Sequence, residues 1–316
     1  MGKDKQMICL LFSGQGAQKT GLTYDLYQTE PHYRKIIAKA SDILQLDLAE
    51  LLFDPDKANE LAQTRYSQPT ILTMSYGLYQ ILSENADFKK LGIGLSLGEY
   101  SGLACANYLE FESALRLIKR RGELMQQASS QNPGIMVAVM KSSLANVELA
   151  VKDAQKIGLI GIANVNTPNQ IVVGGEKDAV QNLREQLEKD GARVVPLKVS
   201  GAFHTPLMKS IQAALKTELN KVDWHNGTFP IYSTTTQKEF APDNLVSTLT
   251  EQLVSTTYFA KTLAQHSQDI TAVVELGPGK TLLSFARKIL KGIPTYQTDS
   301  VTNMQETISA LKEFNS

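Results

Sequence analysis

Short apolar runs that end in glycine alternate with longer amphipathic stretches along this chain of 316 residues. The runs "MICLLFSGQG" (7–16) and "LGIGLSLGEY" (91–100) each fit a buried strand that ends in a glycine-bearing turn. Helical patterns are present at 31–46, at 69–85 with Pro69 near the amino end, and at 111–129. Strands joined by helices pair in parallel, because the chain must cross back over the sheet. The alternation therefore predicts an α/β fold around a parallel sheet.

The middle of the chain follows a different order of elements. Strand patterns occupy 134–140, 160–166, 169–175 and 193–200, with helical patterns at 142–157 and 176–190. This βαββαβ order is that of a ferredoxin-like unit. The larger pattern then resumes with a helix from about 205, a strand at 229–234, a helix near 244–266, a strand at 270–279 and a closing helix. We predict an α/β-hydrolase-like large subdomain with a parallel sheet (1–130 and 200–316) and a small inserted ferredoxin-like α+β subdomain (131–199).

Charge and cysteine content exclude several classes of protein. Lys+Arg and Asp+Glu both number 32, so no overall basic field attracts nucleic acid or an anionic membrane. The two cysteines, Cys9 and Cys105, lie far apart in apolar runs and match neither a disulfide framework nor a metal-binding spacing. No apolar run is long enough for a signal peptide or a membrane span. We expect a cytoplasmic monomer that binds no metal, nucleic acid or membrane.

Two glycine-rich segments resemble nucleotide-binding loops but miss the required frames. "ELGPGKTLL" (275–283) ends like a phosphate-binding loop at Gly279 and Lys280, yet the glycine needed five residues before Gly279 is Val274. "GIGLSLG" lacks the last glycine of a dinucleotide-binding frame, because position 97 is leucine. Neither segment therefore predicts a nucleotide site.

Ser96 lies between Gly94 and Gly98 in a Gly-X-Ser-X-Gly frame, with a strand pattern before it and a helix pattern after it. Glycines on both sides permit a sharp turn that exposes the serine, and the following helix directs free N–H groups toward it. This context is typical of a nucleophile elbow, where an oxyanion is stabilised. The alternative is that small residues merely pack a tight turn, and five residues alone do not decide between the two.

A nucleophilic serine needs a base, and the chain has only four histidines. His32, His225 and His266 lie at polar helix ends or turns, where surface or capping roles are expected. His204 lies in "VSGAFHTPLM", between a strand end and a new helix, which is where open α/β sheets place their sites. No acid precedes a histidine in hydrolase order. A serine–histidine dyad and a full triad therefore both stay open.

Six segments resemble malonyl-CoA:acyl carrier protein transacylases in their order and spacing, over about residues 8–290. They are "FSGQGAQ", "GLSLGEYSGL", "KRRGELMQ", "NVNTPNQIVVGG", "VSGAFHTPLM" and "ELGPGKTLL". The resemblance implies transfer of a malonyl group from malonyl-CoA to the phosphopantetheine thiol of acyl carrier protein by a ping-pong route, with no cofactor. It makes Ser96 the nucleophile and His204 the general base.

The resemblance also assigns supporting roles. It places the oxyanion hole at the backbone N–H groups of Gln15 and Leu97, and it makes Gln252 the residue whose carbonyl orients the catalytic histidine. Arg121 would bind the malonyl carboxylate, which suits a planar guanidinium with parallel hydrogen-bond donors. Helical spacing puts Arg121 on one face with Leu117, Ile118 and Leu124, so its side chain is expected to point inward. The alternative, a solvated face, follows from the neighbouring Lys119 and Arg120.

Four more residues are expected in the substrate pocket. Phe203 resembles the aromatic residue of family members that choose malonyl over methylmalonyl groups, since its ring would crowd a 2-methyl group. Asn164 and Asn166 match a motif that faces the cleft, although a polar turn bonded to its own backbone is an equal alternative. Many family members have histidine before the nucleophile, whereas this chain has Leu95. That difference changes the acyl pocket and leaves the proposed base in place.

Other functions remain open from the sequence. A related acyltransferase that serves a polyketide synthase carrier domain would look alike near the site. A serine esterase or thioesterase would share the elbow, and Leu95 raises the further possibility of a lobe that binds without catalysis. The carrier protein is expected to be acidic, with Lys119, Arg120 and Lys280 as candidates for its docking surface.

Overall fold

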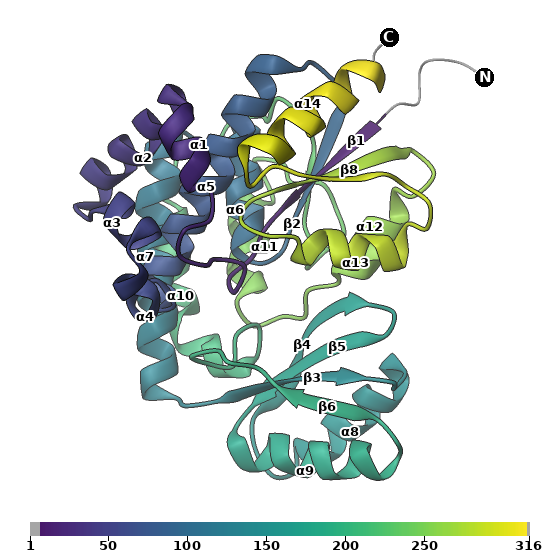
Figure 1. Ribbon diagram of the computed structural model, residues 1–316. Coiled ribbons are helices and arrows are strands. Elements are labelled where there is room, and N and C mark those ends of the chain that lie inside the picture. Colours follow the sequence, from purple (N-terminus) through teal and green to yellow (C-terminus); the bar gives the residue numbers. More distant parts are fainter. Residues whose placement is uncertain (1–6, 315–316) are drawn as a thin grey trace.

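The computed structural model describes residues 7–314, which form a five-stranded parallel sheet and a four-stranded antiparallel sheet with helices around them (Figure 1). The parallel sheet has the order β7 (Ile231–Tyr232), β2 (Lys90–Gly94), β1 (Met7–Phe12), β8 (Ile270–Leu276) and β9 (Thr295–Gln297). Phe12 pairs with Gly94 on one side and Leu276 on the other, so three strands end at one edge. Sites in open parallel sheets lie at this edge. The predicted fold class is confirmed.

Alternate residues of β1 are buried on opposite faces of the parallel sheet. Ile8, Leu10 and Phe12 belong to one apolar cluster, while Cys9 and Leu11 belong to another. The first cluster includes the helices α1 (Tyr24–Thr29), α2 (Pro31–Leu44), α3 (Leu48–Phe53), α4 (Ala58–Leu61), α5 (Thr64–Asn85), α6 (Leu97–Cys105), α7 (Phe111–Gln131), α10 (Gln212–Leu219), α11 (Leu245–Gln252) and α14 (Val301–Phe314). The second cluster contains α12 (Phe259–Gln265) and α13 (Thr281–Ile289). Burial on both faces explains why the sequence of β1 is a continuous apolar run.

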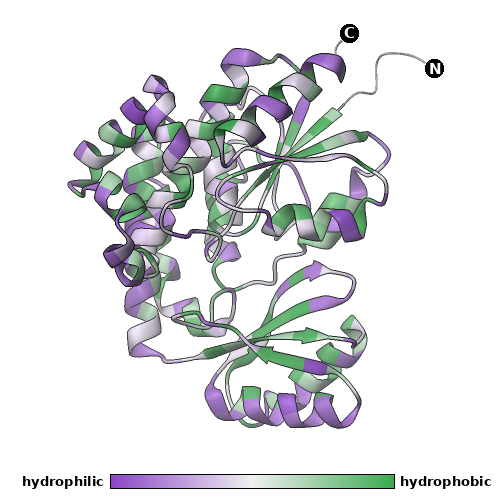
Figure 2. Ribbon diagram, in the orientation of Figure 1, coloured by the Kyte–Doolittle hydropathy of each residue, from purple (hydrophilic) through white to green (hydrophobic). Residues whose placement is uncertain are grey.

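The antiparallel sheet forms a separate lobe with its own core. Its strands are β4 (Ile160–Thr167), β5 (Gln170–Gly175), β3 (Ile135–Met140) and β6 (Arg193–Pro196), in this order across the sheet. Helices α8 (Leu144–Ala154) and α9 (Lys177–Lys189) cover one face through an apolar cluster that includes Val139, Val147 and Leu183. Figure 2 shows the apolar strands and the polar outer side of α9. The strand order is that of the ferredoxin-like unit predicted from the sequence.

The prediction of a single helix near 244–266 is wrong. The chain forms α11 and α12 instead, and the residues between them pair with the small sheet. The N–H of Val165 in β4 donates to the carbonyl of Thr257 at 2.8 Å, and the N–H of Thr257 donates to the carbonyl of Ala163 at 2.9 Å. This pairing satisfies backbone groups that a continuous helix would satisfy internally. It also joins the two lobes beside the carboxyl end of α11.

Three further boundaries differ from the sequence-based expectations. Helix α5 begins at Thr64, so Pro69 lies in its second turn rather than near its amino end. The helix expected from about 205 starts as the 3-10 helix η3 (Pro206–Ile211), and strand β6 ends at Pro196. Strand β9 and helix α14 follow α13 and were not anticipated. No helix within residues 7–314 has the length and apolar content to cross a membrane.

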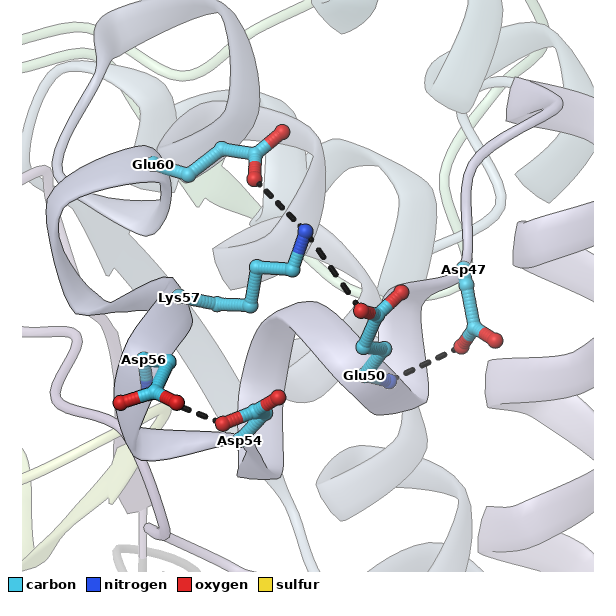
Figure 3. Close-up of polar contacts among 6 residues, drawn as sticks. All are labelled: Asp47, Glu50, Asp54, Asp56, Lys57 and Glu60. Atoms are coloured by element: carbon cyan, nitrogen blue, oxygen red, sulfur yellow. Dashed lines mark hydrogen bonds and ion pairs between the residues drawn. The ribbon is translucent and has the colours of Figure 1, made fainter.

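Three short helices form one corner of the helical layer: α3 (Leu48–Phe53), η2 (Pro55–Lys57) and α4 (Ala58–Leu61). Aspartates cap the first two of them (Figure 3). The Asp47 carboxylate accepts a 2.9 Å hydrogen bond from the N–H of Glu50, and Asp54 caps η2 in the same way. The Lys57 ammonium lies 3.4 Å from Glu50 and 3.2 Å from Glu60. The carboxylates of Asp47, Glu50, Asp54 and Glu60 therefore have local structural partners.

Candidate active site

Ser96 lies on the sharp turn between β2 and α6. Its backbone dihedrals are φ 57° and ψ −110°, which are rare for a residue with a side chain. A Cβ on Gly94 would lie 2.1 Å from the backbone nitrogen of Glu99, and one on Gly98 would lie 2.1 Å from the carbonyl oxygen of Phe12. Both glycines are therefore required by close backbone approach. The strand–turn–helix context predicted for this segment is confirmed.

His204 reaches Ser96 from the loop between β6 and η3. Its Nε2 lies 2.8 Å from Ser96 Oγ, and its Nδ1 lies 2.7 Å from the backbone carbonyl oxygen of Gln252. Because a carbonyl oxygen only accepts, Nδ1 carries the proton and Nε2 presents its lone pair to the serine. Burial, with the nearby charge of Arg121, lowers the pKa of His204 from 6.5 to about 4. The imidazole is thus neutral at pH 7 and able to accept a proton.

Arg121 lies on α7 with its side chain fully buried, as the helical spacing indicated. Its Nη1 donates to Gln68 Oε1 at 2.7 Å, while Nη2 donates to Ser96 Oγ at 3.1 Å and to Gln252 Oε1 at 3.0 Å. The guanidinium carbon is 5.0 Å from the ring centroid of Tyr100. Burial lowers its pKa, yet arginine stays charged in proteins. Within residues 7–314 its Nε–H has no hydrogen-bond partner. A cation with spare donors thus lies beside the serine.

Gln252 connects these groups at the end of α11. Its carbonyl oxygen accepts from His204, its Oε1 accepts from Arg121, and its Nε2 donates to the carbonyl oxygen of Ser96 at 3.1 Å. The residue is fully buried. The break after α11 leaves the last carbonyl groups of the helix free, and His204 uses one of them. Among residues 7–314 no acid contacts His204, so Ser96 and His204 form a hydrogen-bonded pair that is oriented by a carbonyl group rather than by an acid.

The loop after β1 lies directly against the serine turn. The N–H of Leu95 donates to the carbonyl of Phe12 at 3.2 Å, and a Cβ on Gly14 would come within 2.8 Å of the Leu95 carbonyl oxygen. In the part of the chain that the structure describes, the backbone N–H groups of Gln15 and Leu97 donate to no protein group. The Gln15 side chain points elsewhere, to Thr64 Oγ1 at 3.0 Å. Both N–H groups thus remain free for a ligand.

A cavity of about 360 Å³ lies between the two lobes and includes Ser96, His204 and Gln15 in its walls. The four predicted pocket residues line it as well: Leu95, Phe203, Asn164 and Asn166. Asn164 Nδ2 donates to Thr257 Oγ1 at 2.6 Å, which ties it to the segment that joins the lobes. Asn166 is buried, and within residues 7–314 its Oδ1 has no partner. This side-chain amide oxygen of Asn166 is therefore available to a hydrogen-bond donor on a ligand.

The family model for the acyl transferase domain matches residues 9–315. The chain belongs to the acyl transferase domain family. It is 36% identical over 289 residues to the malonyl CoA-acyl carrier protein transacylase of Staphylococcus aureus (strain MRSA252), which covers 90% of this chain and 92% of that relative.

Solved structures agree with this membership. The crystal structure of MCAT from Streptococcus pneumoniae superposes with a TM-score of 0.91 at 34% identity, covering 96% of this chain and 99% of that one. A malonyl-transacylase solved in complex with its type II PKS acyl-carrier protein gives a TM-score of 0.93 at 28% identity, again covering 96% and 99%.

The glycine turn after β8 has a structural role in this acyl transferase. Glu275 is buried and accepts hydrogen bonds from the N–H groups of Leu282 at 3.2 Å and Leu283 at 2.9 Å. It also accepts from the Ser13 hydroxyl at 3.0 Å, at the start of the loop that contains Gln15. Its carboxylate therefore fills the amino end of α13, where a phosphate-binding loop would place phosphate. Desolvation raises the pKa of Glu275 to about 7.

The candidate docking cations are in different settings. Lys119 donates to the carbonyl of Leu44 at 3.0 Å, and Arg120 pairs with Glu123 on the outer side of α7. Lys280 directly precedes α13, whose first residues line the cavity, and Lys198 lines the cavity itself. Lys198 was not anticipated.

Two buried residues of the acyl transferase site were missed by the sequence reasoning. Gln68 holds Arg121, and Glu99 accepts a hydrogen bond from Gln252 Nε2 at 2.6 Å. Both are polar residues within helices that are buried over most of their length, α5 and α6. A polar residue inside such a segment is the available signal, because it must find a buried partner. The signal does not say which partner that is.

Proposed function

We propose that this protein transfers a malonyl group from malonyl-CoA to the phosphopantetheine thiol of acyl carrier protein through a malonyl-Ser96 intermediate. The observation that carries the proposal is the 3.1 Å distance between Arg121 Nη2 and Ser96 Oγ. A guanidinium so close to the nucleophile suits an acyl group whose carboxylate is separated from the thioester carbonyl by a single methylene group. Membership of the acyl transferase family and the names of the relatives support the same substrate.

In the first half-reaction, His204 Nε2 takes the proton of the Ser96 hydroxyl as Oγ attacks the thioester carbon. The negative charge that develops on the carbonyl oxygen is stabilised by the N–H groups of Gln15 and Leu97 and by the amino end of α6. The carbon–sulfur bond then breaks, and the imidazolium returns its proton to the departing CoA thiolate. The product is a malonyl ester of Ser96 and free CoA.

The second half-reaction runs the same steps with the carrier thiol as the nucleophile. His204 takes the thiol proton, the thiolate attacks the ester carbon, and the proton passes to Ser96 Oγ as the ester bond breaks. The carbonyl of Gln252 keeps the imidazole oriented throughout and stabilises its charged form. No cofactor or metal is needed, because the nucleophile, the base and the oxyanion donors all belong to one chain, which also supports a monomer as the active unit.

Selectivity follows from the carboxylate site. Acetyl-CoA would occupy the pocket and leave the buried arginine without an anionic partner, at a cost of about 1–3 kcal/mol. Arg121 also argues against a general esterase, whose acyl groups carry no carboxylate. An esterase would hydrolyse the acyl-enzyme rapidly without any acceptor thiol, and this protein is expected to retain it.

Steady-state kinetics test the proposal. With malonyl-CoA and holo acyl carrier protein varied in turn, a ping-pong route gives parallel double-reciprocal lines. Intersecting lines, or no transfer to the carrier, would contradict it.

A second candidate is the same transfer to a polyketide synthase carrier. The similarity to a malonyl-transacylase bound to a type II PKS acyl-carrier protein favours it. Comparing kcat/KM for a fatty-acid carrier and a polyketide carrier separates the two, and we expect the fatty-acid carrier to be the better acceptor.

A further inference from the structure

Glu99 is a fully buried acid that the reaction described above does not use. It lies in the first turn of α6, three residues after the nucleophile. Its Oε1 accepts hydrogen bonds from both the N–H and the hydroxyl of Thr234, each at 2.6 Å. Its Oε2 accepts from Gln252 Nε2, also at 2.6 Å. A buried carboxylate is costly, so one beside the active site calls for an explanation.

The bond from Gln252 to Glu99 determines which way the glutamine amide points. With Nε2 turned toward the Glu99 carboxylate and the Ser96 carbonyl, Oε1 must face Arg121 Nη2, which lies 3.0 Å away. The reversed amide would set its NH₂ group against the guanidinium and its oxygen against two other oxygens. Donors would then face donors and acceptors would face acceptors at every contact. Glu99 and Arg121 are the two charged groups that make the observed orientation the favourable one, and Glu99 is the one that accepts from Nε2.

We propose that Glu99 is a positioning residue for substrate selection: through Gln252 it holds Arg121 where the guanidinium meets the malonyl carboxylate beside Ser96. The role rests on the proposed function and adds to it. Glu99 does not touch the acyl group. It acts on the preference for a carboxylated thioester over an uncharged one, because only the carboxylated acyl group bonds to Arg121 directly.

Two other ionisable groups act on the carboxylate: Arg121 from α7 and Tyr100 on α6 itself. Burial raises the pKa of Glu99 to about 7, although Thr234, Gln252 and Arg121 oppose the rise. A proton on Oε2 would remove the acceptor for Gln252, with the same result as an amide at this position. The pKa of His204 is about 4, so the base does not titrate near neutral pH.

The test is Glu99→Gln, which keeps the size and shape of the side chain. The amide oxygen still accepts from Thr234, so the new NH₂ group faces Gln252 and favours the reversed glutamine. We expect the ratio of kcat/KM for malonyl-CoA to kcat/KM for acetyl-CoA to fall at least tenfold. If Glu99 acted only through its charge, its loss near Arg121 would favour the anionic substrate and raise the ratio instead. A raised ratio, an unchanged ratio or an equal loss for both substrates would each overturn the proposal.

Glu275→Gln is the matched control. Glu275 is also buried with its pKa raised to about 7, but its hydrogen bonds go to Ser13, Leu282 and Leu283. Any effect on the neighbouring oxyanion loop is common to both acyl groups, so the ratio is expected to stay within about threefold of wild type. If the malonyl-to-acetyl ratio also fell tenfold in Glu275→Gln, loss of any buried acid near the site would lower the ratio. That result would overturn the specific role of Glu99.

The wild-type protein supplies a second arm if Glu99→Gln does not fold, as judged by circular dichroism. The malonyl-to-acetyl ratio should decline as pH is lowered from about 8 to about 6, because Glu99 gains a proton in this range. Glu275→Gln should show the same decline. A ratio independent of pH would in that case overturn the proposal. Wild-type protein that uses no malonyl-CoA contradicts the proposed function instead, which keeps the two failures distinct.

Discussion

Replacing Arg121 with alanine should reverse the substrate preference. The malonyl carboxylate would lose a bidentate grip of two charge-assisted hydrogen bonds, each worth about 1.5–3 kcal/mol, or about 3–6 kcal/mol together. At about 1.4 kcal/mol per factor of ten, kcat/KM for malonyl-CoA should fall by about two to four orders of magnitude. Acetyl-CoA makes no such bonds, so its kcat/KM should stay level or rise.

The assay measures initial rates with each thioester and holo acyl carrier protein as the acceptor. Alanine also leaves the oxygens of Gln68 and Gln252 without the donors that Arg121 supplied. Arg121→Met is the matched control, because it fills much of the volume and still lacks donors. Both variants should show the same reversal of preference. An unchanged malonyl-to-acetyl ratio in either folded variant would refute the carboxylate site.

Three further predictions concern the base, the elbow and the pocket. Because burial lowers the pKa of His204 from 6.5 to about 4, the unfolded chain binds a proton in this window that the folded chain does not, and stability is lost as pH falls. Urea unfolding should therefore show wild type losing about 2 kcal/mol more than His204→Gln between pH 7 and pH 5, and equal losses would argue against a buried neutral imidazole. Gly98→Ala should destabilise the fold by about 1–3 kcal/mol or more in thermal melts, because the new Cβ would lie 2.1 Å from the Phe12 carbonyl oxygen. Gly161→Ala is the control and should not destabilise it, because the atom nearest to its new Cβ lies 3.4 Å away. Equal melting temperatures for the two variants would contradict the close approach at Gly98. Phe203→Leu should raise the use of methylmalonyl-CoA relative to malonyl-CoA by about tenfold or more, and an unchanged ratio would remove the ring from the account of selectivity.

Local patterns predicted the elements that form the site better than the contacts between them. The turn at Ser96 could be predicted because its glycines are close in sequence and their backbone demands are local. The inward direction of Arg121 followed from helical periodicity. The break after α11 could not be predicted, because it is stabilised by pairing with β4, whose residues are distant in sequence. That break gives His204 its carbonyl partner, so the expected Gln252 contact depended on the resemblance rather than on the pattern.

Partners of buried polar residues were also beyond the sequence. Glu99 and Gln68 lie in segments whose apolar content predicts burial, but hydrogen-bond partners depend on how helices pack in three dimensions. Glu99 reaches Gln252 across 153 positions of the chain, and Gln68 reaches Arg121 across 53. The overall fold class required less information, since alternating strands and helices permit few topologies.

The central claim is that Ser96 accepts a malonyl group, and intact-mass analysis after mixing the protein with malonyl-CoA alone tests it most directly. We predict one malonyl adduct per chain, located at Ser96 by peptide mapping and released when holo acyl carrier protein is added. The Ser96→Ala variant, confirmed as folded, should carry no adduct. Absence of the adduct on wild-type protein, or its persistence on Ser96→Ala, would contradict the account.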